Sequence, residues 1–483
     1  MADAALQRAR ELGAGHADFR AARMSSQYLA LSDGSLEALH DRDELGLSVR
    51  VVAGGTWGFA AASELTPEAA AAAAARAVEV ARAAAPVSTE RIELAPEPAH
   101  GEVSYVSACE QDPLAVSLAD KVAVLAGWSA GLLADPRVSH VDASLLQARE
   151  STFYSDGATT ALQQRIRVCP EVTAVAITAG GQFETMRTLA PPAGRGFEYL
   201  TGTGWDFPAE LAELPELLAE KLAAPSVEPG RYDLVIDPSN LWLTLHESVG
   251  HATELDRVLG YEAAYAGTSF ATTDQLGILQ YGSPLLNVTG DRTAPFGLAT
   301  TGYDDEGVAA QSFELITGGV LTGYQLDRRT AVLAGAPRSN GCAYADSPGH
   351  MPIQRMANVS LAAAPGGPGT AELIAGLTDG IYVVGDKSWS IDMQRYNFQF
   401  TGQRFYKISG GRLAGQLRDV AYQANTTQFW NSVQAVGGPQ TYVLGGTFNC
   451  GKGQPGQLAG VSHGCPAVAL SGINILNAAR EAG

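Results

Sequence analysis

The sequence predicts an α+β fold, in which an N-terminal α/β domain of antiparallel strands and long helices precedes a β-rich C-terminal domain. Residues 17–62 are strand-like, with turns at "SDGS" and "AGGTWG", and residues 138–187 alternate between apolar and polar side chains. Two long helical segments, 63–85 and 112–134, lie between them. Beyond residue 260 the chain is rich in glycine and mostly strand-like.

Caps and composition predict the helices of the first domain. An amphipathic segment at 3–13 opens the chain, and "SELTPEAAAAAAARAVEVARAAA" follows the first strands. In that segment Thr66 suits the N-cap, Pro67 suits the first helical position, and alanine has the highest helix propensity. Further helices are expected at 112–134 and 208–223.

A linker with proline and glycine, "APSVEPGRYD", separates the two predicted domains. We place the first at residues 1–225 and the second at 226–483, and the first could divide again near 95–110. In the second, "DLVID" predicts a strand, "PSN" a turn and cap, and the helix that follows carries "HESVGH". "FELITGGVLTGYQL" predicts a hairpin and "TYVLGGTFN" a strand. Helices are expected at 328–335, 370–376 and 417–434.

Composition restricts the partners and the compartment. The 483 residues include 51 acidic side chains against 32 Lys plus Arg, a formal net charge of −19. This charge argues against nucleic acid or an anionic membrane as a partner. No stretch approaches 18 uninterrupted apolar residues and the start lacks a secretory signal, so we expect no membrane-spanning helix. The five cysteines are scattered and odd in number, which fits the reducing cytoplasm.

The segment "LTLHESVGHATELD" (243–256) carries two histidines five residues apart. In the zinc-protease pattern H-E-x-x-H they are four apart, and such positions on an α-helix differ by about 40°. His246 and His251 would instead diverge by about 140°, too far for both rings to reach one ion. The chain must therefore add a residue to this turn, as a π-bulge does, at residues 249–250. Gly250 suits that distortion because glycine tolerates backbone angles that other residues resist.

These histidines are candidate metal ligands. A catalytic zinc takes three protein ligands and keeps one position for water, and His246 and His251 can supply two of the three. Glu247 is placed to take a proton from that water as a general base. The alternative is a pair of helix histidines that make ordinary hydrogen bonds.

The third ligand has several candidates. Cys450 in "GGTFNCGKGQPGQ" is the best, because a thiolate binds zinc tightly and glycines let the backbone approach; its alternative role is a small buried hydrophobe. Glu254 shares a helical face with His251 and could bind the metal itself. We expect it instead to support a ligand from outside the coordination sphere or to have a structural role. We expect Cys465 to pack in the core and His463 to lie in a loop or face the substrate.

An acidic triplet and a lysine give weaker signals. The triplet is Asp304, Asp305 and Glu306. It could hold a second metal, but a turn rim or an ion pair with Arg328 or Arg329 is the simpler expectation. Lys452 could contact a substrate carbonyl group or remain solvated. The segment "GKGQPGQ" lacks the order of a phosphate-binding loop, so nucleotide binding is not expected.

Several segments together resemble the TldD/PmbA family of metallopeptidases, and its catalytic TldD-like branch in particular. "HESVGHATE" is similar to that branch's H-E-x-x-x-H helix, and "NCGKGQ" to its cysteine loop. "GLSVRVVAGGTWGFAAASELTPEAAAAAAARA" resembles the N-terminal domain, and "DDEGVAAQSFELITGGVLTGYQLDR" and "PIQRMAN" resemble stretches between helix and cysteine. The resemblance runs, in the family's order, over about residues 20–470.

The resemblance implies one zinc ion per catalytic subunit, held by His246, His251 and Cys450, with Glu247 as the base. It also implies a dimer that encloses the active site in a chamber, either a heterodimer with a non-catalytic paralogue or a homodimer. Two departures concern the substrate. "VVGDKSWSIDMQRYNFQF" (383–400) differs from the glycine-rich segment expected there, and Cys465 stands where a small residue is expected.

The sequence therefore predicts a zinc-dependent metallopeptidase of the H-E-x-x-x-H type that hydrolyses unfolded or short peptides, as in peptide maturation. The alternative is a zinc-dependent amide hydrolase acting on a small metabolite or a peptide-derived natural-product intermediate, because the departure at 383–400 could reshape the pocket. A non-catalytic partner subunit is the third option, and the retained ligand residues argue against it.

Overall fold

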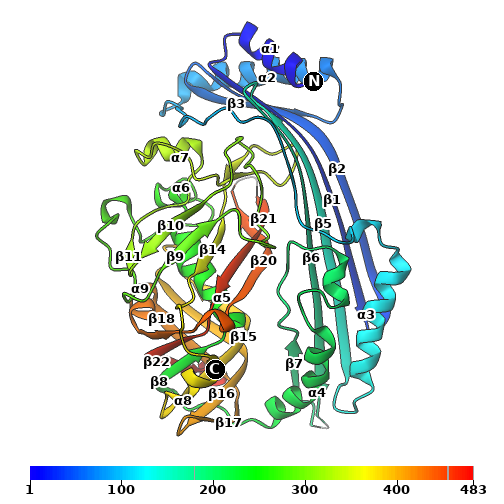
Figure 1. Ribbon diagram of the computed structural model, residues 1–483, viewed down its shortest axis with the longest axis vertical. Coiled ribbons are helices and arrows are strands. Elements are labelled where there is room, and N and C mark those ends of the chain that lie inside the picture. Colours follow the sequence, from blue (N-terminus) through cyan, green and yellow to red (C-terminus); the bar gives the residue numbers. More distant parts are fainter. Residues whose placement is uncertain (179, 454–455, 482–483) are drawn as a thin grey trace.

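Two β-rich parts lie side by side in the computed structural model, which describes residues 1–178, 180–453 and 456–481. Long strands from the first half of the chain occupy one side of Figure 1, and the C-terminal half occupies the other. Residues 454–455 lie outside the described residues. They belong to the segment "GKGQPGQ", for which the sequence predicts no nucleotide binding. The mixed α+β architecture with a β-rich C-terminal part is the one that the sequence predicts.

The N-terminal part is one seven-stranded sheet in the order β3-β2-β1-β5-β6-β4, with β7 also paired to β6. Its strands are β1 (His16–Ser32), β2 (Ser35–Ala53), β3 (Thr56–Ala62), β4 (Gly101–Val106), β5 (His140–Ser155), β6 (Thr159–Ile177) and β7 (Phe183–Arg187). Strands β1, β2, β5 and β6 are antiparallel and span 16 to 19 residues each. They form a long arm beside the C-terminal half (Figure 1).

Helices cover the two ends of this arm. They are α1 (Ala2–Glu11), α2 (Pro67–Ala84), α3 (Leu118–Leu133) and α4 (Phe207–Ala223). The first two pack together at one end and the other two at the opposite end (Figure 1), each pair over its own apolar cluster. The predicted cap of α2 is confirmed, because the Ala69 amide donates to Thr66 Oγ1 at 3.1 Å and Pro67 opens the helix.

A small barrel forms the base of the C-terminal part. Its sheet runs β15-β8-β22-β18-β16-β17, and an additional β15–β16 pairing closes five of these strands into a ring. The strands are β8 (Gly230–Ile236), β15 (Asp379–Ile391), β16 (Asn397–Ser409), β17 (Arg412–Leu417), β18 (Val420–Asn425), β19 (Val433–Val436), which pairs with β22, and β22 (Val468–Asn477). All strands of the first sheet lie within 16–187 and all strands of the barrel sheet within 230–477. The proposed division at 225/226 falls between these two sheets, and it stays a prediction; residues 101–106 of the optional division near 95–110 form strand β4 of the first sheet.

Smaller sheets and short helices complete the C-terminal part. The sheets are formed by β9 (Val288–Asp291), β10 (Ser312–Thr317), β11 (Val320–Leu321) and β14 (Asn358–Leu361), by β12 (Ala343–Tyr344) with β13 (Ile353–Gln354), and by β20 (Val443–Lys452) with β21 (Gln457–Cys465). The helices are α5 (Pro238–Leu245), α6 (Leu255–Val258), α7 (Arg328–Leu333), α8 (Thr370–Ala375), α9 (Thr426–Asn431) and α10 (Ala478–Glu481). Within the described ranges, no helix is both long enough and apolar enough to cross a membrane.

One predicted helix is wrong. Residues 417–434 form strand β18, the short helix α9 and the start of β19 instead of one long helix. Strand β18 lies between β16 and β22, where Val420 and Tyr422 are buried in the barrel core. Tertiary pairing on both edges therefore overrides the helical pattern of this segment.

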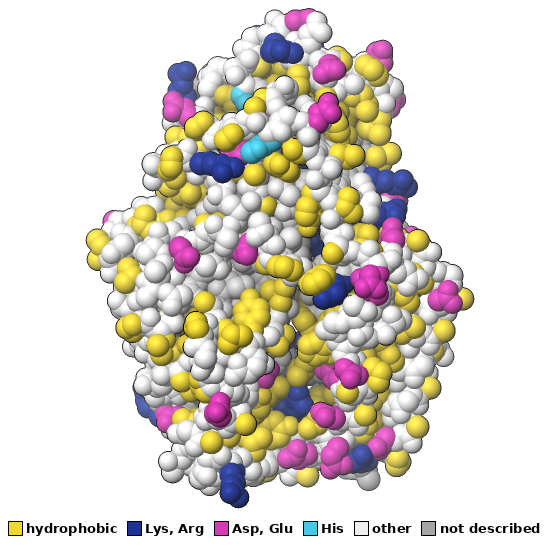
Figure 2. All heavy atoms as spheres, in the orientation of Figure 1, with side chains coloured by type: hydrophobic (Ala, Val, Ile, Leu, Met, Phe, Trp, Pro, Cys, Tyr) yellow, Lys and Arg dark blue, Asp and Glu magenta, His cyan; other side chains and the backbone are white. Residues whose placement is uncertain are grey.

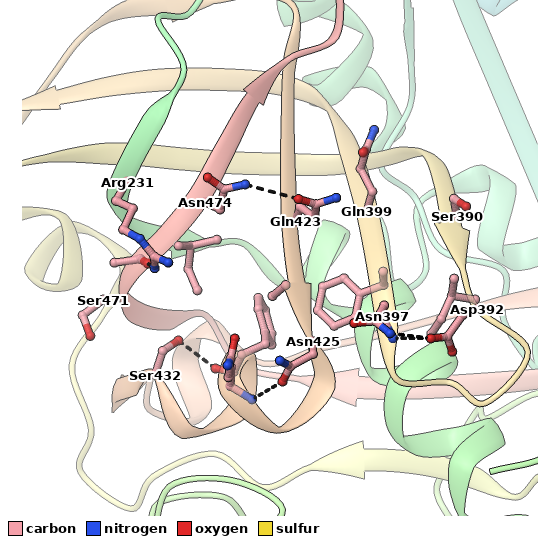
Figure 3. A pocket seen from close by; sticks show the side chains of 17 residues that line it. Arg231, Ser390, Asp392, Asn397, Gln399, Gln423, Asn425, Ser432, Ser471 and Asn474 are labelled. Carbon is pink, nitrogen blue, oxygen red and sulfur yellow. Dashed lines mark hydrogen bonds between the residues drawn. The ribbon is translucent and has the colours of Figure 1, made fainter. Parts of the chain in front are cut away.

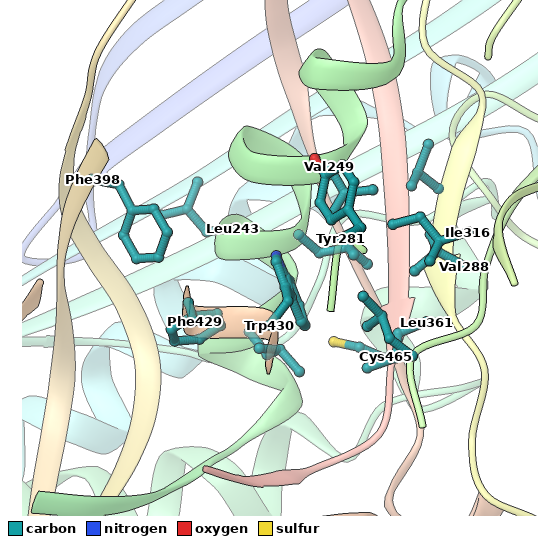
Figure 4. Close-up of a cluster of buried hydrophobic side chains, with 14 of the residues drawn as sticks. Leu243, Val249, Tyr281, Val288, Ile316, Leu361, Phe398, Phe429, Trp430 and Cys465 are labelled. Carbon is teal, nitrogen blue, oxygen red and sulfur yellow. The ribbon is translucent and has the colours of Figure 1, made fainter. Parts of the chain in front are cut away.

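The largest apolar cluster surrounds helix α5 (Figure 4). Leu243 of α5 and Val249 beyond its end pack among side chains from the barrel and from the smaller sheets. Trp430 and Phe429 approach from α9. Cys465 is fully buried in the same cluster, as the sequence predicts. The helix that leads to the two histidines is thus fixed from several directions.

Buried ion pairs join the two halves of the chain at the acidic triplet. Arg50 of β2 pairs with Asp18 of β1 and with Glu306, both at 2.6 Å, and all three side chains are buried. Burial alone would raise the pKa of Asp18, but Arg50 and His16 lower it to about 2. The sequence predicts an ion pair of the triplet with Arg328 or Arg329; in the structure Glu306 forms its ion pair with Arg50 instead.

The other members of the triplet have structural partners as well. Asp305 lies 3.6 Å from Arg20 and accepts a hydrogen bond from the Ala345 amide. Asp304 accepts from the amides of Val308 and Ala343. Asp304 therefore stabilises the loops of the C-terminal half by hydrogen bonds within that half. Asp305 and Glu306 connect the C-terminal half to the long strands through Arg20 and Arg50.

Replacing Arg50 by methionine should lower the free energy of unfolding by about 3–5 kcal/mol, because two buried carboxylates then lose their cation. Urea denaturation measures this loss. Arg42→Met is the matched control on the same strand, since Arg42 is exposed and a surface pair contributes about 0–1 kcal/mol. Equal losses in the two variants would contradict a structural role for the buried pairs.

Candidate metal centre

The helix that carries the two histidines is irregular where their spacing predicts it. Asp237 caps α5 by accepting from the Ser239 amide at 3.0 Å. After Leu245 the chain forms a π-helical turn, His246–Gly250, and then one 3₁₀ turn, His251–Thr253, before Glu254 turns to an extended conformation. The predicted wide turn is confirmed, and the helix also ends early. The extra residue lets both imidazoles face one point.

The reason for glycine at position 250 differs from the predicted one. Gly250 has φ −52° and ψ −61°, helical angles that any residue can adopt. Space is the constraint, because a Cβ atom here would lie 2.7 Å from Met356 Sδ and 3.0 Å from its Cε. Met356 is fully buried, so it has little room to withdraw. Close packing therefore requires glycine at this position, and backbone strain does not.

Three side chains converge on one point. His246, His251 and Cys450 each offer a ligand atom, and these atoms lie within 4.8 Å of one another. The Cys450 Sγ to His251 Nε2 distance is 3.7 Å, close to the roughly 3.6 Å that a tetrahedral ion with bonds of about 2.0–2.3 Å would impose. Cys450 comes from β20, where an irregularity in the pairing with β21 between Thr447 and Cys450 redirects the strand.

A chain of hydrogen bonds fixes the proton on His246. His463 Nδ1 lies 2.9 Å from the Val359 carbonyl oxygen, which can only accept, so Nδ1 carries the hydrogen. Burial lowers the pKa of His463 to about 4, so its Nε2 is a bare acceptor 2.7 Å from His246 Nδ1. His246 therefore donates from Nδ1 and keeps the Nε2 lone pair free for an ion.

A carboxylate does the same for His251. Glu254 Oε2 accepts from His251 Nδ1 at 2.7 Å, which leaves the His251 Nε2 lone pair free. Burial lowers the pKa of His251 to about 3, against the opposing effect of Glu254, so the ring is neutral. Lys452 Nζ lies 3.1 Å from Glu254 Oε1 and keeps this buried carboxylate paired. Glu254 thus stands behind a ligand, where the sequence predicts it.

Two predicted substrate contacts are corrected by their surroundings. Lys452 has no exposed surface, and its ammonium group is held by Glu254, by Asp256 at 2.7 Å and by Gln354 at 2.6 Å. His463 is equally buried, on strand β21 between His246 and a backbone carbonyl group. Neither side chain can reach a substrate; each supports a candidate ligand instead.

The donor set fits zinc. Two neutral imidazoles and one cysteine sulfur are ligands that zinc prefers in proteins, and three protein ligands are typical of a catalytic site. Burial, followed by the nearby His251 and His463, keeps the pKa of His246 well below its usual range. Burial raises the pKa of the Cys450 thiol, so binding of a metal would release its proton.

Glu247 lies on the same π-turn and pairs with an arginine that the sequence analysis did not single out. Arg395 Nη1 contacts Glu247 Oε2. Burial raises the pKa of Glu247, and the Arg395 guanidinium opposes that rise. Glu247 keeps 6% of its surface exposed, and His246, His251 and Cys450 keep 4–5%. Small reactants can therefore reach the centre, but it is otherwise enclosed.

A cleft of about 320 Å³ leads towards this centre from the space between the two halves. Figure 2 shows the surface hollowed between the C-terminal half and the long strands, with hydrophobic side chains along the hollow. The apolar lining includes Trp242, Trp389 and Phe448 from the C-terminal half and Leu146 and Leu189 from the N-terminal half. The Trp242 ring lies 6.4 Å from the His246 ring, so the cleft ends beside a candidate ligand.

A larger cavity lies elsewhere. It measures about 1220 Å³ and opens on the outer face of the barrel, over β15, β16, β18 and β22 (Figure 3). Its lining is polar, with Asn397, Gln423 and Asn474 among the side chains. None of the candidate metal ligands lines it.

Sequence reasoning missed two parts of this centre for different reasons. The role of His463 has a weak signal, since Val461, His463 and Cys465 alternate on one buried face of β21. Arg395 has no such signal, because its contact with Glu247 joins residues 148 positions apart.

Comparison with known proteins gives a consistent result. The model of the PmbA/TldA metallopeptidase C-terminal domain matches residues 229–477, and that of PmbA/TldA metallopeptidase domain 1 matches residues 17–81. A metalloprotease of Methanothermobacter thermautotrophicus is 28% identical over 94% of each chain. A zinc metalloprotease TldD homologue of Saccharolobus solfataricus is 22% identical over 97% of this chain and 98% of its own.

A solved structure supports the same fold. TldE from Thermococcus kodakarensis superposes with a TM-score of 0.71, at 14% sequence identity, over 97% of this chain and 98% of that chain. At this identity the likeness concerns the fold alone.

Replacing Cys450 by serine should lower zinc affinity by more than the roughly 10–100-fold that follows loss of an outer-shell partner, because a ligand itself is removed. Elemental analysis and chelator competition measure the effect. Cys109→Ser is the control, since Cys109 is not part of the donor cluster and is partly exposed. Undiminished zinc in Cys450→Ser would remove Cys450 from the ligand set.

Gly250→Val should weaken zinc binding more than it weakens the fold, because the new side chain meets Met356 and pushes the π-turn out of position. Zinc affinity and the melting temperature are measured on the same samples. Adding Met356→Ala should restore part of the zinc affinity by making room for the valine. A Gly250→Val protein with unchanged zinc affinity would show that the close approach has no consequence.

Proposed function

This chain belongs to the PmbA/TldA metallopeptidase family, and on that premise we propose that it is a zinc-dependent peptidase of the H-E-x-x-x-H type, with one zinc per catalytic subunit. One observation carries the proposal: the ligand atoms of two neutral imidazoles and one thiol lie within 4.8 Å of one another, beside a carboxylate that is buried but for 6% of its surface. The ligands are His246, His251 and Cys450, and the carboxylate is Glu247.

The chemistry follows from the positions of these groups. Zinc, when bound, supplies a Lewis acid that polarises a carbonyl group and acidifies water. Glu247 takes a proton from the attacking water. At the same time the water oxygen bonds to the carbonyl carbon, and the C=O electron pair moves onto the carbonyl oxygen. When the C–N bond breaks, that pair re-forms the carbonyl group, and Glu247 passes the proton to the departing nitrogen. A carboxylic acid and an amine are released.

We propose that the substrate is an unfolded or short peptide bound as an added strand. Among the described residues, β20 pairs only with β21, and residues 443 and 445–449 of β20 line the cleft. Trp242, whose ring lies 6.4 Å from that of His246, lines the same cleft. An extended peptide beside β20 would bind through backbone hydrogen bonds, which tolerate many sequences. A cleft of about 320 Å³ admits an extended chain and excludes a folded protein.

The assembly and compartment are proposed on similar grounds. The family resemblance favours a dimer that encloses the site in a chamber, either with a non-catalytic paralogue or with a second copy of this chain. The retained donor set argues that this chain is the catalytic subunit. All five cysteines are free, which favours a reducing compartment such as the cytoplasm.

One observation favours the second candidate, a zinc-dependent amide hydrolase for a small metabolite or a peptide-derived natural-product intermediate. The divergent segment 383–400 includes the turn that holds Arg395 against Glu247, so it narrows the approach to the base. Digestion of a peptide library in parallel with a panel of small amides separates the two. Cleavage of small amides alone would favour the second candidate.

Glu247→Gln should keep its zinc and its fold but lose about 10²–10⁴-fold in turnover, because the amide preserves the shape of the side chain and removes the base. Turnover is measured on zinc-loaded protein, with elemental analysis of the same sample. Glu102→Gln, an exposed residue of β4, is the control. Turnover near that of the unaltered enzyme in zinc-loaded Glu247→Gln would remove Glu247 from the mechanism.

A further inference from the structure

The turn between β15 and β16 is held in place by hydrogen bonds to residues 268–270 and by hydrogen bonds within the turn. Met393 O accepts from the Thr268 amide at 2.8 Å, and Gln394 O accepts from the Phe270 amide at 2.9 Å. Inside the turn, the Asp392 carboxylate accepts from the amide of Tyr396 and from the amide and side chain of Asn397, at 2.7–2.9 Å. Asp392 and Asn397 lie together at the edge of the large cavity (Figure 3).

Arg395, at the tip of this turn, has an unusual backbone. Its φ is +63°, in the left-handed region that residues other than glycine seldom adopt. Thr426 holds it there, because its Oγ1 donates to Arg395 O and its amide donates to Tyr396 O, both at 2.7 Å. Such backbone strain persists where the surroundings impose it, and it gathers at functional sites.

The strained backbone delivers a guanidinium group to the general base. Arg395 Nη1 pairs with Glu247, and the side chain is only 14% exposed. Its Nε is buried and has no hydrogen-bond partner among the described residues. Nε lies on a different edge of the planar group from Nη1, so one donor edge stays free beside the base. A buried donor without a partner is costly unless a ligand supplies the missing acceptor.

We propose that Arg395 is a catalytic residue whose free guanidinium edge donates to the carbonyl oxygen of the scissile amide. This inference rests on the proposed hydrolase function and deepens it. When water adds to the carbonyl carbon, the C=O electron pair moves onto oxygen and Glu247 holds the water proton. Arg395 binds that negative oxygen and keeps its own protons, because the guanidinium group does not lose a proton in proteins. Collapse of the adduct returns the electron pair, breaks the C–N bond and ends the contact.

The test uses Arg395→Gly, because glycine adopts the left-handed conformation freely and the turn should keep its shape. The kcat of zinc-loaded enzyme should fall by about 10²–10³-fold, as on removal of other oxyanion donors, with little change in KM. Guanidinium or methylguanidinium ions should restore part of the activity. Arg412→Gly, an exposed arginine on β17, should retain kcat.

Two readouts do not depend on turnover. Arg395→Gly should bind zinc at least as tightly as the unaltered protein, because the substitution removes a cation near the ion. Chelator competition measures this affinity. A phosphonamidate peptide, which mimics the tetrahedral adduct, should bind about 10²-fold more weakly to Arg395→Gly. The matching peptide substrate should bind with nearly the same affinity to zinc-loaded Glu247→Gln and to the zinc-loaded double variant Glu247→Gln, Arg395→Gly, neither of which cleaves it.

The possible outcomes separate this inference from the function on which it rests. Inactive Glu247→Gln together with Arg395→Gly within about threefold of normal kcat would overturn the role of Arg395 alone. Loss of zinc from Arg395→Gly would show that Arg395 supports the metal site. A rise in KM limited to peptides with a free C-terminal carboxylate would show that Arg395 determines specificity. Either result overturns the proposal. If Arg395→Gly does not fold, Arg395→Asn, which also tolerates this φ, takes its place with the same expectations.

Discussion

The centre depends on one geometric constraint: two imidazoles five residues apart must face the same point. A regular α-helix cannot satisfy it, since the two side chains would diverge by about 140°. The chain satisfies it with a π-helical turn, His246–Gly250, and ends the helix one turn later. The early end is also useful, because it frees Glu254 to turn back behind His251.

The remainder of the fold holds that turn in place. Strand β8 of the barrel leads directly into α5, whose apolar side chains are enclosed by the main cluster (Figure 4). Strand β21 brings His463 behind His246, and β20 brings Cys450 opposite His251. Elements distant in the sequence thus supply the third candidate ligand and the hydrogen bonds that fix the proton of each imidazole.

Residue type and helical geometry were enough to predict part of this arrangement. The candidate ligands, the candidate base and the irregular turn follow from local patterns, as do α2 with its cap and the long hairpins of the first domain. Contacts between distant positions could not be predicted in this way. His246 and His463 lie 217 positions apart, and Arg50 and Glu306 lie 256 apart. The packing of Met356 against Gly250 and the strand at 420–425 likewise depend on neighbours that a single sequence does not reveal.

The balance of buried charge around the centre connects its electrostatics to its chemistry. Three carboxylates, Glu247, Glu254 and Asp256, face three cations, Arg395, Arg257 and Lys452, so these paired groups sum to zero. A divalent ion adds two positive charges, and loss of the Cys450 proton offsets one of them. Summed over these groups, a zinc-loaded centre would carry one excess positive charge in a poorly solvated site, where charge interacts strongly. In the proposed mechanism that excess would stabilise the negative charge that develops on the reacting oxygen, and Arg395, the most exposed of the three cations, would contribute to it.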